Sequence, residues 1–129
     1  MNRRTFFLAS LLSSTSLSAS MAQEKQISLI YVGGWDCGPC ISWKNNKKAD
    51  WLASKERAKV NYIEIESPKL KEAYQDRYWP TELRPVRDQL KDKWGTPRFL
   101  IVRDGKVLAS EWGHGDWDRT SQKLRDMLA

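Results

Sequence analysis

The chain has 129 residues, of which 22 are Lys or Arg and 16 are Asp or Glu, so its formal net charge is +6. This length suits one domain and is too short for a TIM barrel or a two-half dinucleotide-binding fold. A mean hydropathy of −0.66 argues against an integral membrane protein, and 40% apolar residues argue against a disordered chain. Two Cys and one His exclude a disulfide-dense scaffold and a four-thiolate zinc site.

Residues 1–22 have the layout of a secretory signal. Two arginines precede an apolar run, Phe6–Leu17, that is too short to span a bilayer, and a small-residue pattern ends at Ala22. We therefore expect cleavage after Ala22, export, and a single domain over residues 23–129; an N-terminal anchoring or amphipathic helix is the alternative. The stretch Arg3–Phe7 also resembles a twin-arginine signal, which leaves both twin-arginine and general secretion open. A mildly basic exported protein does not predict a nucleic-acid partner.

The mature chain begins with a strand, a helix and a second strand. The apolar, β-branched run Ile27–Val32 predicts a strand buried on both faces. Residues 37–54 predict a helix, and Val60–Ile65 predicts another strand. This order implies a parallel pair with a right-handed crossover. The inward face of the helix is expected to carry Cys40, Trp43 and Trp51.

A long connection follows, and its apolar spacing predicts helices. Residues 68–78 predict one helix, and a second apolar repeat runs from Leu83 to Trp94, with Pro85 confined to its first turn. Four aromatic side chains of this connection are expected to pack inward, the alternative being a partner surface. They are Tyr74, Tyr78, Trp79 and Trp94.

The last part of the chain predicts a hairpin and a helix. Strands are expected at Arg98–Val102 and Lys106–Trp112, joined at Asp104-Gly105 by a type I′ turn that needs positive φ at both residues. Asp116 is expected to cap a final helix that ends at Leu128. Its inward face would carry Trp117, Leu124 and Leu128. The predicted fold class is α/β, with a four-stranded mixed sheet and helices on both faces.

The strongest chemical signal is Cys37-Gly38-Pro39-Cys40, placed between a buried strand and a helix. A disulfide across so small a loop contributes only about 2 kcal/mol of stability by chain entropy. It is therefore better explained as a bond that opens and closes. Cys37 would lie at the helix N-terminus, where free N–H groups favour the thiolate, and Cys40 would lie deeper. Pro39 suits the first helical turn, and Gly38 leaves room for a partner backbone.

Other readings of the motif remain open. A zinc half-site would need two further ligands, and His114 is the one histidine available. Haem attachment needs His directly after the second Cys, where Ile41 stands. An incidental structural disulfide is the remaining alternative. We expect no metal and no cofactor.

The dipeptide Thr96-Pro97 precedes a predicted inner strand, where Pro is out of place unless it has a local role. We expect a cis bond that turns the backbone N–H and C=O of Thr96 outward. Those groups would pair with an extended substrate segment beside Cys37.

In this order, Trp35, the Cys37–Cys40 motif, Thr96-Pro97, Asp104-Gly105 and Gly113 resemble the thioredoxin family over nearly all the mature chain. The resemblance implies a thioredoxin-like fold without the extra N-terminal strand and helix, with an enlarged helical connection before the cis-Pro strand. It implies dithiol–disulfide exchange, with Cys37 as nucleophile, Cys40 as resolver and Pro97 in cis. Trp35, Thr96 and Pro97 would contact substrate. Trp43 and the segment 96–115 also resemble small periplasmic thioredoxins of bacterial sulfur-oxidation systems.

The chain departs from the family pattern around the motif. Asp36 separates Trp35 from Cys37, and its carboxylate would oppose thiolate formation, with Arg98 expected to offset it. Tyr31 stands where thioredoxins carry a buried Asp, and Trp43 where cytochrome-maturation relatives carry Glu. No carboxylate is therefore in place to deprotonate Cys40.

The predicted function is that of a periplasmic thiol–disulfide oxidoreductase that reduces disulfides of exported client proteins. A membrane thiol reductase would return electrons to it. A disulfide oxidase or isomerase, and a non-catalytic binding or regulatory module, are the alternatives. We expect a monomer.

Overall fold

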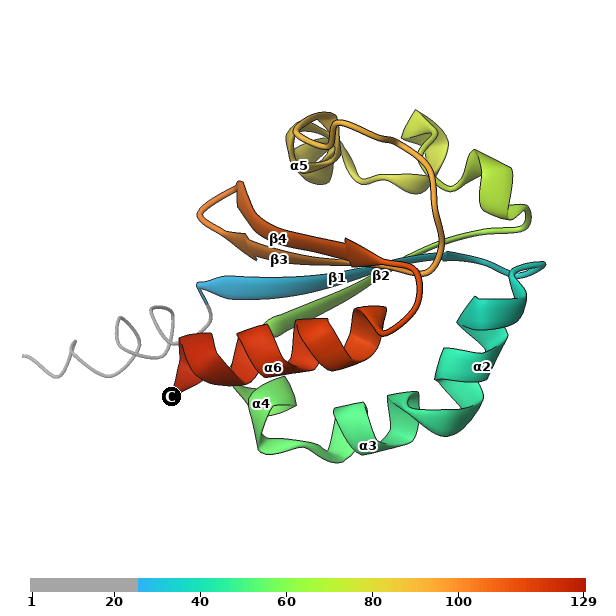
Figure 1. The fold of residues 1–129 in the computed structure, drawn as a ribbon. Helices are drawn as coiled ribbons and strands as arrows, with labels where there is room; N and C mark the ends of the chain where they lie inside the picture. The colour runs from blue at the N-terminus through green and yellow to red at the C-terminus, as the bar shows by residue number, and fades with distance from the viewer. Residues whose placement is uncertain (1–25) are drawn as a thin grey trace, which may run out of the picture.

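A computed structural model describes residues 26–129 of the chain (Figure 1). The predicted signal segment, residues 1–22, lies outside the described residues. In chain order the elements are β1 Ile27–Gly34, α2 Gly38–Asn46, α3 Lys48–Ala53, α4 Lys55–Ala58, β2 Asn61–Ser67, η1 Leu70–Glu72, η2 Asp76–Tyr78, η3 Thr81–Leu83, α5 Arg84–Asp88, β3 Arg98–Arg103, β4 Lys106–Trp112 and α6 Asp116–Leu128.

The strands form one mixed sheet in the order β2-β1-β3-β4. β1 runs parallel to β2 and antiparallel to β3, and β3 and β4 form an antiparallel hairpin. At the hairpin turn, Asp104 has φ 51° and Gly105 has φ 76°, so both residues adopt the positive φ expected of a type I′ turn. The predicted four-stranded mixed sheet is confirmed.

Both faces of the sheet are covered. Helices α2, α3, α4 and α6 lie on one side, and α5 with the short η turns lies on the other (Figure 1). The side chains of β1 alternate between the two cores: Leu29 and Tyr31 join the cluster under α2 and α6, and Ile30 and Val32 join the one under α5. All four are fully buried, which confirms β1 as a strand covered on both faces.

The helix predicted over residues 37–54 is broken at Lys47 into α2 and α3. Lys47 has φ −125°, and its N–H closes α2 on the Trp43 carbonyl at 2.8 Å. In one continuous helix, Trp43 and Trp51 would differ in direction by about 80°. The break instead brings both indoles onto Trp117 of α6, with ring centroids 5.3 and 5.5 Å away.

The prediction of a helix over residues 68–78 is wrong. The structure has two isolated 3₁₀ turns there, η1 and η2, separated by extended backbone at Gln75. Because Ala73 lies outside a regular helix, its carbonyl is free to accept a hydrogen bond from the indole N–H of Trp79 at 2.8 Å. Trp79 is almost fully buried, so tertiary packing overrides the local helical spacing.

The second helix of the connection is shorter than predicted. Its apolar repeat is realised only in η3 and α5, with Pro85 in the first turn of α5 as expected. The Gln89 side chain follows and bridges to the hairpin, donating to Gly105 O at 2.7 Å and accepting from the Val107 N–H at 2.9 Å. Trp94 lies beyond the helix and is 57% exposed, whereas the other three aromatic side chains of the connection pack against the α5 core.

Helix α6 has the predicted extent, but its cap differs. Gly115, in the left-handed conformation with φ 75°, is the N-cap, and Asp116 is the first helical residue. The Asp116 carboxylate accepts a hydrogen bond from the adjacent Trp117 N–H at 2.6 Å instead of capping the helix. Leu124 is buried, and Trp117 and Leu128 pack against the same core, as predicted.

Candidate active site

The end of β1 places Cys37 at the start of α2. A turn at Trp35 and Asp36 follows Gly34, and Cys37 is the N-cap of the helix. Its sulfur accepts a hydrogen bond from the Cys40 backbone N–H at 3.2 Å, the contact that an N-cap side chain normally makes. Cys37 and Cys40 form a disulfide, with their Cα atoms 5.2 Å apart.

A second donor reaches the same sulfur from a distant part of the chain. The Thr96 hydroxyl lies 3.3 Å from Cys37 Sγ and donates to it, although the two residues are 59 positions apart. The Thr96–Pro97 peptide bond is cis and leads directly into β3. The structure therefore brings together the two segments that the sequence singled out.

Both cysteines are buried: Cys37 is 1% exposed and Cys40 is fully enclosed. Cys37 nevertheless lines a cleft of about 370 Å³, bounded by Pro39 and Thr96 and by residues of the connection between β2 and β3. The sequence predicted that Cys40 would lie deeper than Cys37, but the two are almost equally buried. The cleft is the approach to the Cys37 sulfur.

The core beneath the disulfide is apolar and aromatic. Tyr31 stacks on Trp43 at 5.0 Å between ring centroids, and both share a buried cluster with Cys37 and Cys40. Burial, reinforced by Glu64, raises the pKa of Tyr31 well above its usual range, so its hydroxyl stays protonated at neutral pH. Within residues 26–129, neither the Tyr31 hydroxyl nor the Trp43 indole N–H has a hydrogen-bond partner.

Asp36 and Arg98 have separate partners. The exposed Asp36 carboxylate accepts from the Leu70 N–H at 2.7 Å. The buried Arg98 guanidinium donates to Ser110 Oγ at 3.0 Å and to the Trp94 carbonyl. Arg98 was expected to offset the charge of the Asp36 carboxylate, but the structure shows no direct contact between the two side chains. The physical reason is that each group is held by a different part of the chain: η1 binds the Asp36 carboxylate, whereas β4 and the segment before β3 bind Arg98.

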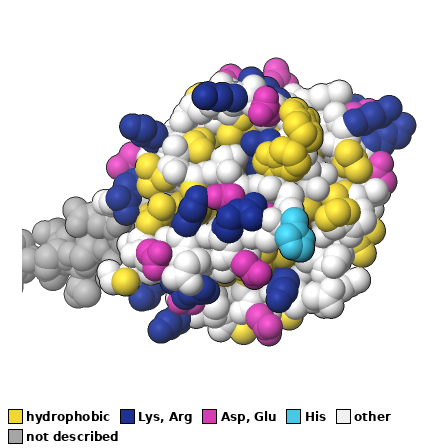
Figure 2. Space-filling model, in the orientation of Figure 1, with side chains coloured by type: hydrophobic (Ala, Val, Ile, Leu, Met, Phe, Trp, Pro, Cys, Tyr) yellow, Lys and Arg dark blue, Asp and Glu magenta, His cyan; other side chains and the backbone are white. Residues whose placement is uncertain are grey.

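The surface around the motif is open and rich in tryptophan. Trp35 is 64% exposed, and a Cβ added to Gly38 would meet no atom within 4 Å. Trp94 and Trp112, both exposed, pack edge to face with centroids 4.4 Å apart. Figure 2 shows hydrophobic side chains gathered above His114, the cyan side chain, on this face of the molecule.

The connection between β2 and β3 contributes residues that sequence reasoning missed. Leu70, Lys71 and Lys93 line the cleft beside Cys37. Tyr74 and Trp94, for which a partner surface was the alternative to inward packing, line it as well. The excess length of the connection was the available signal, but nothing in its local pattern indicates that it folds back beside the motif.

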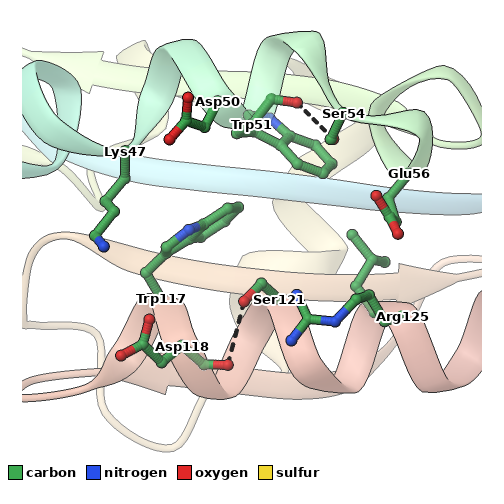
Figure 3. A pocket seen from close by; sticks show the side chains of 10 residues that line it. Lys47, Asp50, Trp51, Ser54, Glu56, Trp117, Asp118, Ser121 and Arg125 are labelled. Carbon is green, nitrogen blue, oxygen red and sulfur yellow. Dashed lines mark hydrogen bonds between the residues drawn. The ribbon is translucent and has the colours of Figure 1, made fainter.

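A separate hollow of about 250 Å³ lies between α3–α4 and α6 (Figure 3). Two indoles, Trp51 and Trp117, and charges of both signs line it. The hydroxyls of Ser54 and Ser121 are bonded to carbonyls of their own helices, those of Trp51 and Asp118. The hollow contains neither cysteine, so it is not a candidate for redox chemistry.

Among residues 26–129, no helix has the length and apolar character needed to cross a membrane. The same residues hold no group of three His, Cys, Asp or Glu side chains placed to bind a metal ion.

Comparison with known proteins identifies the fold. No protein-family model and no curated protein matches the chain. Solved structures do: Malassezia sympodialis thioredoxin has a TM-score of 0.56 at 13% identity, covering 89% of this chain and 90% of its own. Oxidised thioredoxin O2 from Arabidopsis thaliana has 0.53 at 14% identity, covering 92% of each chain. Trypanosoma brucei brucei thioredoxin has 0.52 at 19% identity, covering 98% of each. The chain therefore has a thioredoxin-like α/β fold, with a CxxC disulfide at the start of its first helix.

Proposed function

We propose that the protein is a thiol–disulfide oxidoreductase in which Cys37 is the attacking thiol. One observation carries this proposal: the two sulfurs of the motif differ in their hydrogen-bond donors. Cys37 Sγ accepts from the Cys40 N–H and from the Thr96 hydroxyl, at 3.2 and 3.3 Å. Both sulfurs lie in the same buried apolar cluster, but within the described residues Cys40 Sγ accepts neither of these two hydrogen bonds. Burial opposes ionisation of both thiols, whereas the donors stabilise a thiolate at Cys37 alone, so Cys37 ionises first once the bond is reduced.

The reaction is an exchange of disulfides. The Cys37 thiolate attacks one sulfur of a client disulfide, forming a mixed disulfide and expelling the other client sulfur as a thiolate, which takes up a proton. Cys40 then loses its proton to solvent and attacks Cys37 Sγ. The Cys37–client bond breaks, the second client thiol leaves, and the intramolecular disulfide forms. Two electrons have passed from the protein to the client.

As a finer proposal, the protein is exported to the periplasm and works as a reductase. The signal-like segment 1–22 supports export. The Gly38-Pro39 pair resembles that of reducing thioredoxins, whose potential is about −270 mV, in contrast to oxidases near about −120 mV. In an oxidising periplasm the disulfide must be re-reduced, which a membrane dithiol reductase would do. The resemblance to the small thioredoxins of sulfur-oxidation systems favours clients of that kind.

Trapping of the intermediate tests the proposal. With Cys40→Ser, the reduced protein should accumulate a mixed disulfide with a disulfide-bonded client, visible by intact-mass spectrometry. Cys37→Ser, the matched control, should form none. If C40S binds partner proteins but forms no covalent bond with any of them, the protein is a binding module. Equilibration with glutathione then tests the direction of electron flow: a potential above about −150 mV would exclude a role as a reductase.

A further inference from the structure

The approach to Cys37 is bounded by two walls that are both fixed in place. On one side, η1 lies directly on the end of β1, where a Cβ on Gly34 would be 2.6 Å from Leu70 Cα. On the other side, the Tyr74 hydroxyl donates to the Gly95 carbonyl at 2.7 Å, and Arg98 holds the Trp94 carbonyl. Burial raises the pKa of Tyr74 to about 12, so this hydroxyl remains a donor at neutral pH. The cleft therefore has a defined shape.

The charged side chains lining this cleft are both lysines, Lys71 from η1 and Lys93 from the segment before β3. Both are exposed, and neither has an ion-pair partner among residues 26–129. Other lysines of the chain are neutralised by ion pairs: Lys44 pairs with Glu66, and Lys48 pairs with Glu64 at 2.6 Å.

Three acidic side chains are sequence neighbours of residues that line the cleft, but none of the three lines it. The Asp36 carboxylate accepts from the Leu70 N–H, Glu72 pairs with Arg77, and Asp92 lines a different hollow. The lining of the cleft beside the reactive sulfur thus carries two unpaired ammonium groups and no carboxylate. Such a surface attracts acidic groups and repels basic ones.

We propose that the cleft formed by Lys71 and Lys93 beside Cys37 selects client segments with acidic side chains next to the disulfide. This inference rests on the proposed function, because it names the substrate class of the same site. A client strand that brings its disulfide to Cys37 passes between the two ammonium groups, and aspartate or glutamate flanking its cysteine pairs with them.

The test uses three disulfide-linked peptide dimers that are identical except for the residues beside the cysteine: Asp, Asn or Lys. The full chain, reduced beforehand, is mixed with each peptide, and the second-order rate of its oxidation is measured. The variant K71E/K93E removes the two cleft charges. The matched control K59E/K106E makes the same change in net charge at the other end of the sheet, because Lys59 precedes β2 and Lys106 begins β4. Neutral hydroxyethyl disulfide provides the reference for competent folding.

We expect K71E/K93E to lower the rate with the Asp peptide by about fivefold or more, the size expected of two exposed ion pairs. The rate with the Asn peptide should be unchanged, and that with the Lys peptide should rise. K59E/K106E should leave all three rates unaltered. The discrimination should vanish near 1 M salt, where the Debye length is about 3 Å.

The inference is overturned if the peptides react equally in wild-type protein, or if K59E/K106E has the same effect as K71E/K93E. It is also overturned if only glutathione disulfide, a small anionic disulfide, responds to K71E/K93E, because the cleft would then recognise a small molecule instead of a client segment. Equal reaction with every peptide leaves the oxidoreductase proposal standing. Failure of the wild-type protein to react with any disulfide overturns both.

Discussion

Thr96 offers the cleanest perturbation of the proposed nucleophile. Thr96→Val removes the hydroxyl that donates to Cys37 Sγ at 3.3 Å and keeps the shape of the side chain. A hydrogen bond to a charged group contributes about 1.5–3 kcal/mol, and the long contact to a diffuse sulfur places this one near the lower limit. Since about 1.4 kcal/mol corresponds to one pKa unit, the pKa of the Cys37 thiol should rise by about one unit.

The assay is the rate of alkylation of the reduced protein as a function of pH. Well below both midpoints the thiolate fraction falls about tenfold, but a more basic thiolate is more nucleophilic, with a Brønsted slope of about 0.4–0.5. The T96V protein should therefore react about threefold more slowly at low pH and about threefold faster at high pH, so the two profiles cross.

Thr96→Ser is the matched control, because it keeps the hydroxyl and should keep the wild-type midpoint. The reasoning is refuted if T96V and wild type have the same midpoint, or if T96S shifts as far as T96V does. In either case the contact between Thr96 and the sulfur has no influence on ionisation.

Three further changes test the packing around the site. Y31F should raise the free energy of unfolding by about 1 kcal/mol, because it deletes a buried hydroxyl that has no hydrogen-bond partner in residues 26–129. If chemical denaturation instead shows Y31F to be about 1 kcal/mol less stable, the hydroxyl does make a hydrogen bond. G34A should lower stability by about 2 kcal/mol, because the new methyl group meets the Leu70 backbone; unchanged thermal unfolding would contradict this. For Glu111, burial opposes ionisation, but two cations of α6 hold the pKa of its carboxyl below the usual value. The ionised Glu111 carboxylate therefore stabilises the fold above its unfolded pKa, and this stabilisation is lost as the pH falls through its folded pKa. E111Q should lower the free energy of unfolding by about 1 kcal/mol at neutral pH and leave it unchanged in acid. A loss of stability that is independent of pH would disprove this ion-pair account.

The sheet and the redox motif could be predicted from the sequence because their determinants are local. Continuous apolar runs mark the buried strands, and Asp104-Gly105 can adopt the positive φ values of a tight hairpin turn. The Cys37–Cys40 motif can be placed from its neighbours in the sequence, because it follows a strand and opens a helix that begins at Gly38. For these parts, the preference of the segment and the needs of the fold agree.

The segment between β2 and β3 could not be predicted because distant contacts decide its path. The Trp79 indole takes the Ala73 carbonyl that a helix would use, and the Gln89 side chain bonds to the hairpin instead of extending α5. Neither contact has a periodic signature. This segment also positions Lys71 and Lys93, so the cleft beside Cys37 could not be predicted from the sequence either.

The central claim is that Cys37 is the reactive thiol and Cys40 the protected one. The most direct measurement is treatment of the fully reduced protein with one equivalent of iodoacetamide at neutral pH, followed by peptide mapping. The account predicts modification of Cys37, at a rate above that of a free cysteine, with Cys40 left intact. Equal labelling of the two thiols, preferential labelling of Cys40, or a Cys37 no faster than a free cysteine would contradict it.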